Sequence, residues 1–258
     1  MKFKAACVQF DVSNDDVRGN VDFVISALEH LHQENVKLVV LPELWAAKFD
    51  KEKANELWLF SQEALRKIYS LSKKYEMIIA GSLIEKEGSD YFNTAYITDV
   101  SGKEIGKYRK VHLFSMAGEN NYFKCGQEKI VVNTGLGKLG IIICYDLRFP
   151  ELTRSVALNG AEILLVPAQW PKARVKHWRT LAIARAIENQ FFVVACNRTG
   201  HDKKEEYPGH SLIIDPWGEV LAEAGEEEGF IVAEIDLDRV KSVRQTMRCF
   251  DDRKPDVY

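Results

Sequence analysis

The chain is poor in the residue patterns that cross-link a protein or bind metal. It has five cysteines in 258 residues, an odd count without any C-x-x-C pair, and six histidines without ligand spacing. His30 and His32, for example, stand two apart in a predicted helix and therefore face different ways. These absences exclude a disulfide framework and a zinc site, so we expect no metal to be required.

An excess of charge and long apolar runs are also missing. The formal net charge of -3 gives no general attraction to nucleic acid or anionic membranes, and no stretch is long enough to span a bilayer. The start, residues 1–10, is too short before Asp11 for a signal peptide and fits a first strand better. A basic stretch at 172–179 is balanced by acids elsewhere and is interpreted as a solvated helix face. We therefore expect a cytoplasmic protein with neither a nucleic-acid nor a membrane partner.

The order of predicted elements indicates an α/β protein with one domain spanning residues 1–258. Strands and helices alternate at both ends of the chain, whereas hairpins occupy the middle. Each helix has one apolar face, which suits a four-layer αββα sandwich with helices outside two sheets. The predicted helices are 15–33, 52–74, 150–159 and 173–189, and the predicted strands are 3–10, 36–42, 77–84, 92–98, 104–108, 129–133, 138–143, 162–166, 191–197, 211–214, 219–222 and 230–235.

One cysteine, Cys144, stands where an apolar run ends and a helix is about to begin. The predicted strand 138–143 leads into it, and Pro150 is a favourable first-turn residue of the following helix. Such a strand-to-helix bend leaves a nucleophile both exposed and supported, and its N–H groups favour a thiolate and can bind an oxyanion. Cys7 and Cys196, in contrast, lie within apolar strands and are expected in the core.

Three segments together resemble the signatures of the nitrilase superfamily of carbon–nitrogen hydrolases. They are Leu41-Pro42-Glu43, Tyr108–Phe114 and Cys144–Glu151, in that order. Segments 185–189 and 215–218 also match, so the resemblance covers nearly the whole chain. It implies an αββα sandwich, no cofactor, a homodimer or larger homo-oligomer, and a catalytic set of glutamate, lysine and cysteine.

By this resemblance, Glu43 is the general base, Lys110 the oxyanion stabiliser and Cys144 the nucleophile. Glu119 fits the place of a second glutamate that the family carries between the lysine and the cysteine. The chemistry agrees, because a thiol that attacks an amide needs a base or a lowered pKa, and a compact cation stabilises the developing oxyanion. The N–H of Tyr145 would be the second donor. Taken singly, these residues are more often turn, surface or core residues, so only their joint occurrence favours catalysis.

The substrate is the feature that the sequence determines least. Segments 112–119 and 144–150 resemble the bacterial ω-amidase branch, which acts on ω-amides of 2-oxo acids such as 2-oxoglutaramate and in some cases serves methionine salvage. A small anionic substrate needs a cationic or N–H-rich pocket end, for which Arg148, His112 and Lys172 are candidates. The other predicted substrate-binding residues are Tyr145, Phe114, Met116, Gln169 and Trp170, with core packing as the alternative for the last four.

Several alternatives share the same catalytic residues. They are an amidase of deaminated glutathione, an N-carbamoyl amidohydrolase and a nitrilase. From another class, a redox-sensing thiol protein would use Cys144 and leave Glu43 and Lys110 incidental. A binding protein that kept the fold and lost turnover is a third class, which the intact catalytic set argues against. Ammonia release from amides separates the amidase from the redox protein.

Overall fold

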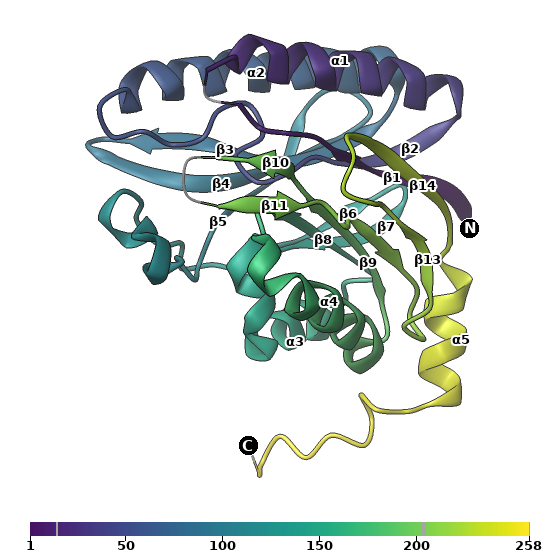
Figure 1. Cartoon of the computed structure of the whole chain (residues 1–258). Coiled ribbons are helices and arrows are strands. Elements are labelled where there is room, and N and C mark those ends of the chain that lie inside the picture. Colours follow the sequence, from purple (N-terminus) through teal and green to yellow (C-terminus); the bar gives the residue numbers. More distant parts are fainter. Residues whose placement is uncertain (14, 203–204, 258) are drawn as a thin grey trace.

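Four layers of secondary structure make up the protein. The computed structural model describes residues 1–13, 15–202 and 205–257. Two six-stranded sheets lie face to face between two layers of helices (Figure 1). The predicted αββα sandwich is therefore confirmed. Among the described residues, no helix is long and apolar enough to cross a membrane. One outer layer holds α1 (Val17–Gln33) and α2 (Ala54–Tyr75), and the other holds α3 (Pro150–Leu158) and α4 (Val175–Asn189).

The first sheet contains β1 (Lys2–Gln9), β2 (Val36–Val40), β3 (Ile78–Glu87), β4 (Asp90–Thr98), β5 (Glu104–Arg109) and β14 (Gly229–Asp236). Its order is β14-β1-β2-β3-β4-β5. Strands β1, β2 and β3 run parallel, and β3, β4 and β5 are joined as antiparallel neighbours. Strand β5 therefore points the same way as β2. The residues that follow these two strands emerge at the same edge of the sheet, which is where Glu43 and Lys110 lie.

The second sheet contains β6 (Val131–Thr134), β7 (Gly137–Ile141), β8 (Ile163–Ala168), β9 (Phe192–Asn197), β12 (Leu212–Ile214) and β13 (Val220–Glu223). Its order is β13-β12-β9-β8-β7-β6, and β7, β8 and β9 run parallel at its centre. Chain segments leaving the carboxyl ends of adjacent parallel strands converge, and such edges commonly hold binding sites in α/β proteins. Cys144, Gln169 and Arg198 all lie just beyond these ends.

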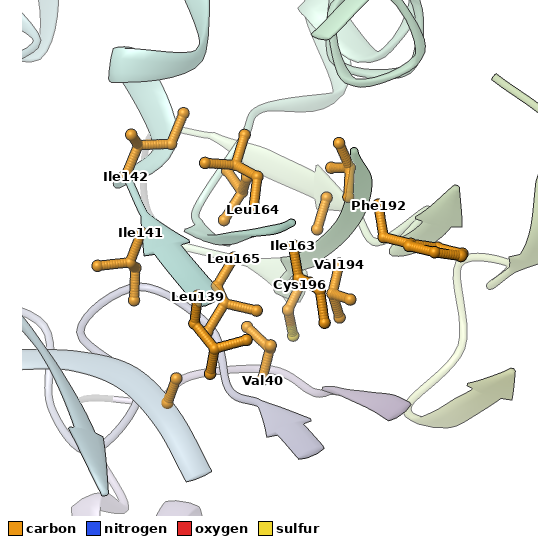
Figure 2. Close-up of a cluster of buried hydrophobic side chains, with 14 of the residues drawn as sticks. Val40, Leu139, Ile141, Ile142, Ile163, Leu164, Leu165, Phe192, Val194 and Cys196 are labelled. Atoms are coloured by element: carbon orange, nitrogen blue, oxygen red, sulfur yellow. The ribbon is translucent and has the colours of Figure 1, made fainter. Parts of the chain in front are cut away.

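An apolar core fills the space between the sheets. Figure 2 shows Val40 of β2 facing side chains of the second sheet, among them Leu139, Leu165 and Cys196. Full burial of an aliphatic side chain stabilises a fold by about 1.5–3 kcal/mol, so this cluster holds the two sheets together. Cys7 and Cys196 are fully buried, which confirms that both are core thiols.

The structure contains elements that the sequence did not predict. Strands β10 (Thr199–His201) and β11 (Glu206–Pro208) form a separate antiparallel pair, and α5 (Asp238–Thr246) follows β14. Three-residue strands are too short to show alternation, and α5 buries only Val240 and Val243, so its apolar stripe is narrow. The predicted helix 173–189 is also divided, because its start is a 3₁₀ turn and α4 begins at Val175.

Candidate active site

Cys144 lies on a sharp bend beyond β7. A 3₁₀ turn runs from Cys144 to Arg148, and α3 begins at Pro150. Cys144 has a φ of 44°, in the left-handed region that residues other than glycine rarely adopt, so the backbone is strained at the sulfur-bearing residue. The predicted strand-to-helix bend is confirmed. The expected exposure is wrong: Cys144 is only 8% exposed, because Glu43 and Gln169 lie against its sulfur.

A buried carboxylate two residues beyond the cysteine holds the bend. Asp146 accepts hydrogen bonds from the N–H of Ile143 at 3.0 Å and from the hydroxyl of Tyr108 at 2.6 Å. Its Oδ1 accepts the N–H of His112 at 2.8 Å and lies 2.8 Å from Nδ1 of the same residue. Tyr108 belongs to β5 of the first sheet. The backbone around Cys144 is therefore fixed to both sheets.

Glu43 follows β2 and reaches across to the second sheet. Its Oε1 accepts hydrogen bonds from Nζ of Lys110 and Nδ2 of Asn93, each at 2.7 Å. Its Oε2 accepts the N–H of Gln169 at 2.9 Å. Leu44, the next residue, has a φ of 47°, which turns the chain sharply. Three N–H donors and this turn hold the carboxylate in one orientation.

Lys110 follows β5 and lies between two carboxylates. Its Nζ is 2.7 Å from Glu43 Oε1 and 2.8 and 3.0 Å from the two oxygens of Glu119. Glu119 also accepts the N–H of Phe114 at 2.7 Å. The lysine side chain is 2% exposed, so these contacts are shielded from water. The structure thus brings Glu43, Lys110, Glu119 and Cys144 together; their catalytic roles stay predictions.

Burial and charge set the protonation states in this cluster. Burial raises the pKa of Cys144 well above its ordinary value and the Glu43 carboxylate raises it further, while Lys110 and the N–H of Gln169 only partly counteract this. Burial alone would lower the pKa of Lys110, but Glu43 and Glu119 raise it well above its ordinary value. The resting pair is therefore a neutral thiol beside a lysine cation. A thiol in this state needs a base, and Glu43 is the carboxylate in contact with it.

Four of the predicted substrate-binding residues form one connected group beside the bend. The rings of Phe114 and Tyr145 lie 4.9 Å apart, centre to centre. The Arg148 guanidinium lies 4.6 Å from the ring centre of Trp170 and 6.0 Å from that of Tyr145. Trp170 is buried, and its Nε1 donates to the carbonyl of Arg174 at 2.8 Å. The group offers an aromatic wall with a cation on it.

The remaining predicted substrate-binding residues are not part of this aromatic group. His112 is bonded to Asp146 and stacks on Phe149 with 3.6 Å between ring centres. Met116 is 81% exposed on the 3₁₀ turn Ser115–Ala117. Gln169 binds Glu43, to whose carbonyl its Nε2 donates at 2.7 Å. Substrate contacts by these three residues stay predictions.

Lys172 and Arg148, two candidates for binding a substrate carboxylate, differ in their ion pairs. Lys172 forms ion pairs with Glu206 at 2.6 Å and Glu226 at 3.2 Å. For Arg148, no carboxylate in the described part of the chain forms an ion pair, and its nearest polar partner is Nδ1 of His177 at 3.4 Å. Burial lowers the pKa of Arg148, and the positive charge of Arg174 adds to this effect. Arg148 is therefore the cation near Cys144 that an anion would stabilise most.

Several residues of this region were missed by the sequence reasoning. Asn93 bridges Glu43 and Glu119, Asp146 holds the bend, and the side chain of Asn197 binds both the N–H and the carbonyl of Trp170. Each is a buried polar residue in or beside an apolar segment. A buried polar group without partners is costly, so a polar residue within an apolar run was the signal in the sequence that could have identified them. No group of His, Cys, Asp and Glu in residues 1–13, 15–202 and 205–257 is arranged to hold a metal ion.

Comparisons with known proteins agree with this geometry. A family model for carbon–nitrogen hydrolases matches residues 4–245. The chain is 43% identical over 263 aligned residues to a 2-oxoglutaramate amidase of Bacillus subtilis, with 100% of both chains covered. It is 34% identical over 261 aligned residues to a deaminated glutathione amidase of Synechocystis sp., covering 95% of this chain and 96% of that one.

A solved structure gives the same result for the fold. Nit3 of Saccharomyces cerevisiae, a member of branch 10 of the nitrilase superfamily, matches with a TM-score of 0.87 at 32% identity, over 95% of this chain and 94% of that one. The chain therefore belongs to the carbon–nitrogen hydrolase family. The predicted family is confirmed, and with it the prediction of a hydrolase acting on carbon–nitrogen bonds such as those of amides.

Proposed function

We propose that this protein is an ω-amidase. It hydrolyses the terminal carboxamide of a small 2-oxo acid of the 2-oxoglutaramate type to a carboxylate and ammonia. The observation that carries the proposal is the contact of Lys110 with both Glu43 and Glu119 beside the bend at Cys144. The 43% identity to a 2-oxoglutaramate amidase over the full length supports the substrate class.

The first half of the reaction forms a thioester. Glu43 takes the proton from the Cys144 thiol as the sulfur attacks the amide carbon. The carbonyl oxygen becomes an oxyanion that Lys110 and the N–H of Tyr145 stabilise. The N–H of Tyr145 is available because Tyr145 lies in the first turn of its 3₁₀ segment, where N–H groups have no acceptor within their own helix. The carbon–nitrogen bond then breaks, the nitrogen takes the proton from Glu43, and ammonia leaves. Glu119 orients Lys110 and the leaving amine.

The second half releases the acid. Glu43 takes a proton from a water molecule, whose oxygen attacks the thioester carbon. The same donors stabilise the second oxyanion, because the acyl carbon has not moved. When the carbon–sulfur bond breaks, the sulfur recovers the proton from Glu43. The acid product loses its remaining proton to solvent and leaves as a carboxylate. Every charged group needed for these steps is a side chain of the chain itself, so no cofactor enters the mechanism.

The substrate carboxylate binds to Arg148. This guanidinium lies on the Trp170 ring, next to the turn that carries Cys144, and lacks a carboxylate partner among the described residues. An arginine can bind a carboxylate through two parallel hydrogen bonds. A neutral amide would leave the partly buried cation unpaired, so the site should discriminate against it.

A panel of substrates tests the proposal. Ammonia release is measured with 2-oxoglutaramate, an N-carbamoyl amino acid, a neutral aliphatic amide and a nitrile. Deaminated glutathione carries its amide nitrogen in a peptide, so release of that peptide amine is measured for it instead. We expect the highest kcat/KM for 2-oxoglutaramate. Faster turnover of the carbamoyl compound or the neutral amide would reject the substrate assignment while leaving amide hydrolysis in place.

A deaminated glutathione amidase is the second candidate, because a relative of that name is 34% identical over nearly the whole chain. The two substrates share a 2-oxo acid end and differ in size, so the panel separates them. A redox-sensing thiol is disfavoured by the site. Such thiols are exposed and have a low pKa, whereas Cys144 is buried and its pKa is raised.

The cellular setting belongs to the same proposal. Transamination of glutamine yields the 2-oxo acid amide, so the enzyme would follow a transaminase, with methionine salvage as one setting. We expect a cytoplasmic homodimer or larger homo-oligomer that binds neither nucleic acid nor membranes. Light scattering on the protein as it elutes from a size-exclusion column measures its mass. The mass of a monomer would contradict the expected oligomer.

A further inference from the structure

A second buried cation lies behind the proposed catalytic base. Arg198 follows β9, and its side chain is 0% exposed. Its guanidinium forms an ion pair with Asp11 and lies 4.3 Å from the ring centre of Tyr207. Its Nε donates to the carbonyl of Thr199 at 3.2 Å. Thr199 and Tyr207 belong to the β10–β11 pair and Asp11 follows β1, so segments distant in sequence hold the guanidinium in one place.

The third edge of this guanidinium faces Gln169. Nη1 of Arg198 donates to Oε1 of the Gln169 side chain at 3.3 Å. The same amide group donates through Nε2 to the carbonyl of Glu43 at 2.7 Å. The backbone N–H of Gln169 donates to Oε2 of Glu43 and also forms a hydrogen bond to Cys144. One residue therefore contacts both the base and the nucleophile, and Arg198 orients its side chain.

We propose that Arg198 is a positioning residue of the reaction, acting through Gln169 on Glu43; the inference rests on the proposed amidase function. Arg198 touches none of the reacting groups. Its guanidinium fixes the Gln169 side-chain amide, which donates to the backbone carbonyl of Glu43. The backbone N–H of the same glutamine donates to the Glu43 carboxylate. Small displacements of a catalytic group by a distant change reduce rates by up to about 10²-fold.

A double-mutant cycle separates positioning from general support of the fold. Arg198→Met should lower kcat about 10–100-fold and leave KM within about threefold, since substrate contacts are intact. Gln169→Leu removes the side-chain amide and keeps the backbone N–H, so it should lower kcat similarly. In the double variant, we expect no further loss beyond that of Gln169→Leu. Effects of residues that act through one another are not additive.

Two further variants keep the test decisive. Arg198→Lys keeps a charge beside Asp11 but lacks the fork that reaches three partners, so it should lose kcat while folding normally. Arg244→Met is the matched control: it removes a partly buried arginine that donates to the Ala161 carbonyl at 3.0 Å, away from the site. It should cost stability and leave kcat unchanged.

The outcomes separate this inference from the proposed function. The positioning role would be overturned if Arg198→Met lowered kcat equally in the wild-type and the Gln169→Leu proteins. Near-normal kcat in a folded Arg198→Lys variant would overturn it too. If the unaltered enzyme releases no ammonia from any amide, the proposed function fails instead. The positioning role of Arg198 is then tested by the rate at which iodoacetamide alkylates Cys144. We expect the same change in this rate in Arg198→Met and in Gln169→Leu, and no further change in the double variant; additive changes would overturn the positioning role.

Discussion

Removing the Lys110 charge should impair both turnover and stability. In Lys110→Met, the oxyanion loses one donor, which typically lowers kcat about 10²–10³-fold. The buried Glu43 carboxylate and the partly buried Glu119 carboxylate also lose their shared cation, to which three contacts of 2.7–3.0 Å bind them. Breaking a buried ion pair on one side costs about 3–5 kcal/mol. We therefore expect a folded but destabilised protein, measured by ammonia release and by denaturant unfolding at pH 7.

A surface lysine with similar partners provides the control. Lys172 also bridges two glutamates, Glu206 and Glu226, but all three side chains are exposed, so Lys172→Met should change unfolding far less. The pH dependence adds a second check. Because the pKa of Lys110 is raised on folding, its stabilisation is fully present below the unfolded value of 10.5 and is lost as pH rises through the folded pKa. The stability gap between wild type and Lys110→Met should therefore persist to about pH 10 and close above it. Near-normal kcat, or equal unfolding free energies at pH 7, would refute this reasoning.

Other substitutions test the remaining assignments. Cys144→Ala should abolish ammonia release with the fold retained, whereas Cys7→Ala and Cys196→Ala should mainly reduce the melting temperature; an acyl adduct found by mass spectrometry on another cysteine would contradict this. Glu43→Gln should lose about 10²–10⁴-fold in kcat, and a folded variant with normal kcat would remove Glu43 from the mechanism. Arg148→Met should lower kcat/KM for 2-oxoglutaramate about 10–100-fold while sparing a neutral amide; equal losses for both substrates would argue against carboxylate binding. Activity should survive dialysis against EDTA, and a loss that added zinc restores would show a metal requirement.

Local chemistry let the sequence predict the layers and the bend. The apolar run before Cys144 and Pro150 after it specify a strand, a turn and a helix, because backbone preferences act over a few residues. Each helix with one apolar face must bury that face against a sheet, and this requirement predicted the four layers. The 3.6-residue and two-residue periods could not reveal β10 and β11, since three residues are too few to show a pattern.

Motif order allowed Glu43, Lys110 and Cys144 to be named together, yet their environment depended on the fold. The sequence predicted an exposed thiol with N–H groups favouring a thiolate. Tertiary packing instead buries Cys144 against Glu43 and raises its pKa, so a base becomes necessary. Gln169, predicted as a pocket wall, binds Glu43.

The sequence by itself determined the family, the αββα layers and the identity of the residues proposed for catalysis. These features follow from local patterns and from short motifs in a fixed order. Only the tertiary structure decided which charges are compensated and which groups support the base. Within the described residues, Lys172 has carboxylate partners and Arg148 has none. Arg198 reaches Gln169 because strands distant in sequence end at the same edge of two packed sheets. Long-range contacts of this kind leave no periodic signal in the chain, since each partner belongs to a different local pattern.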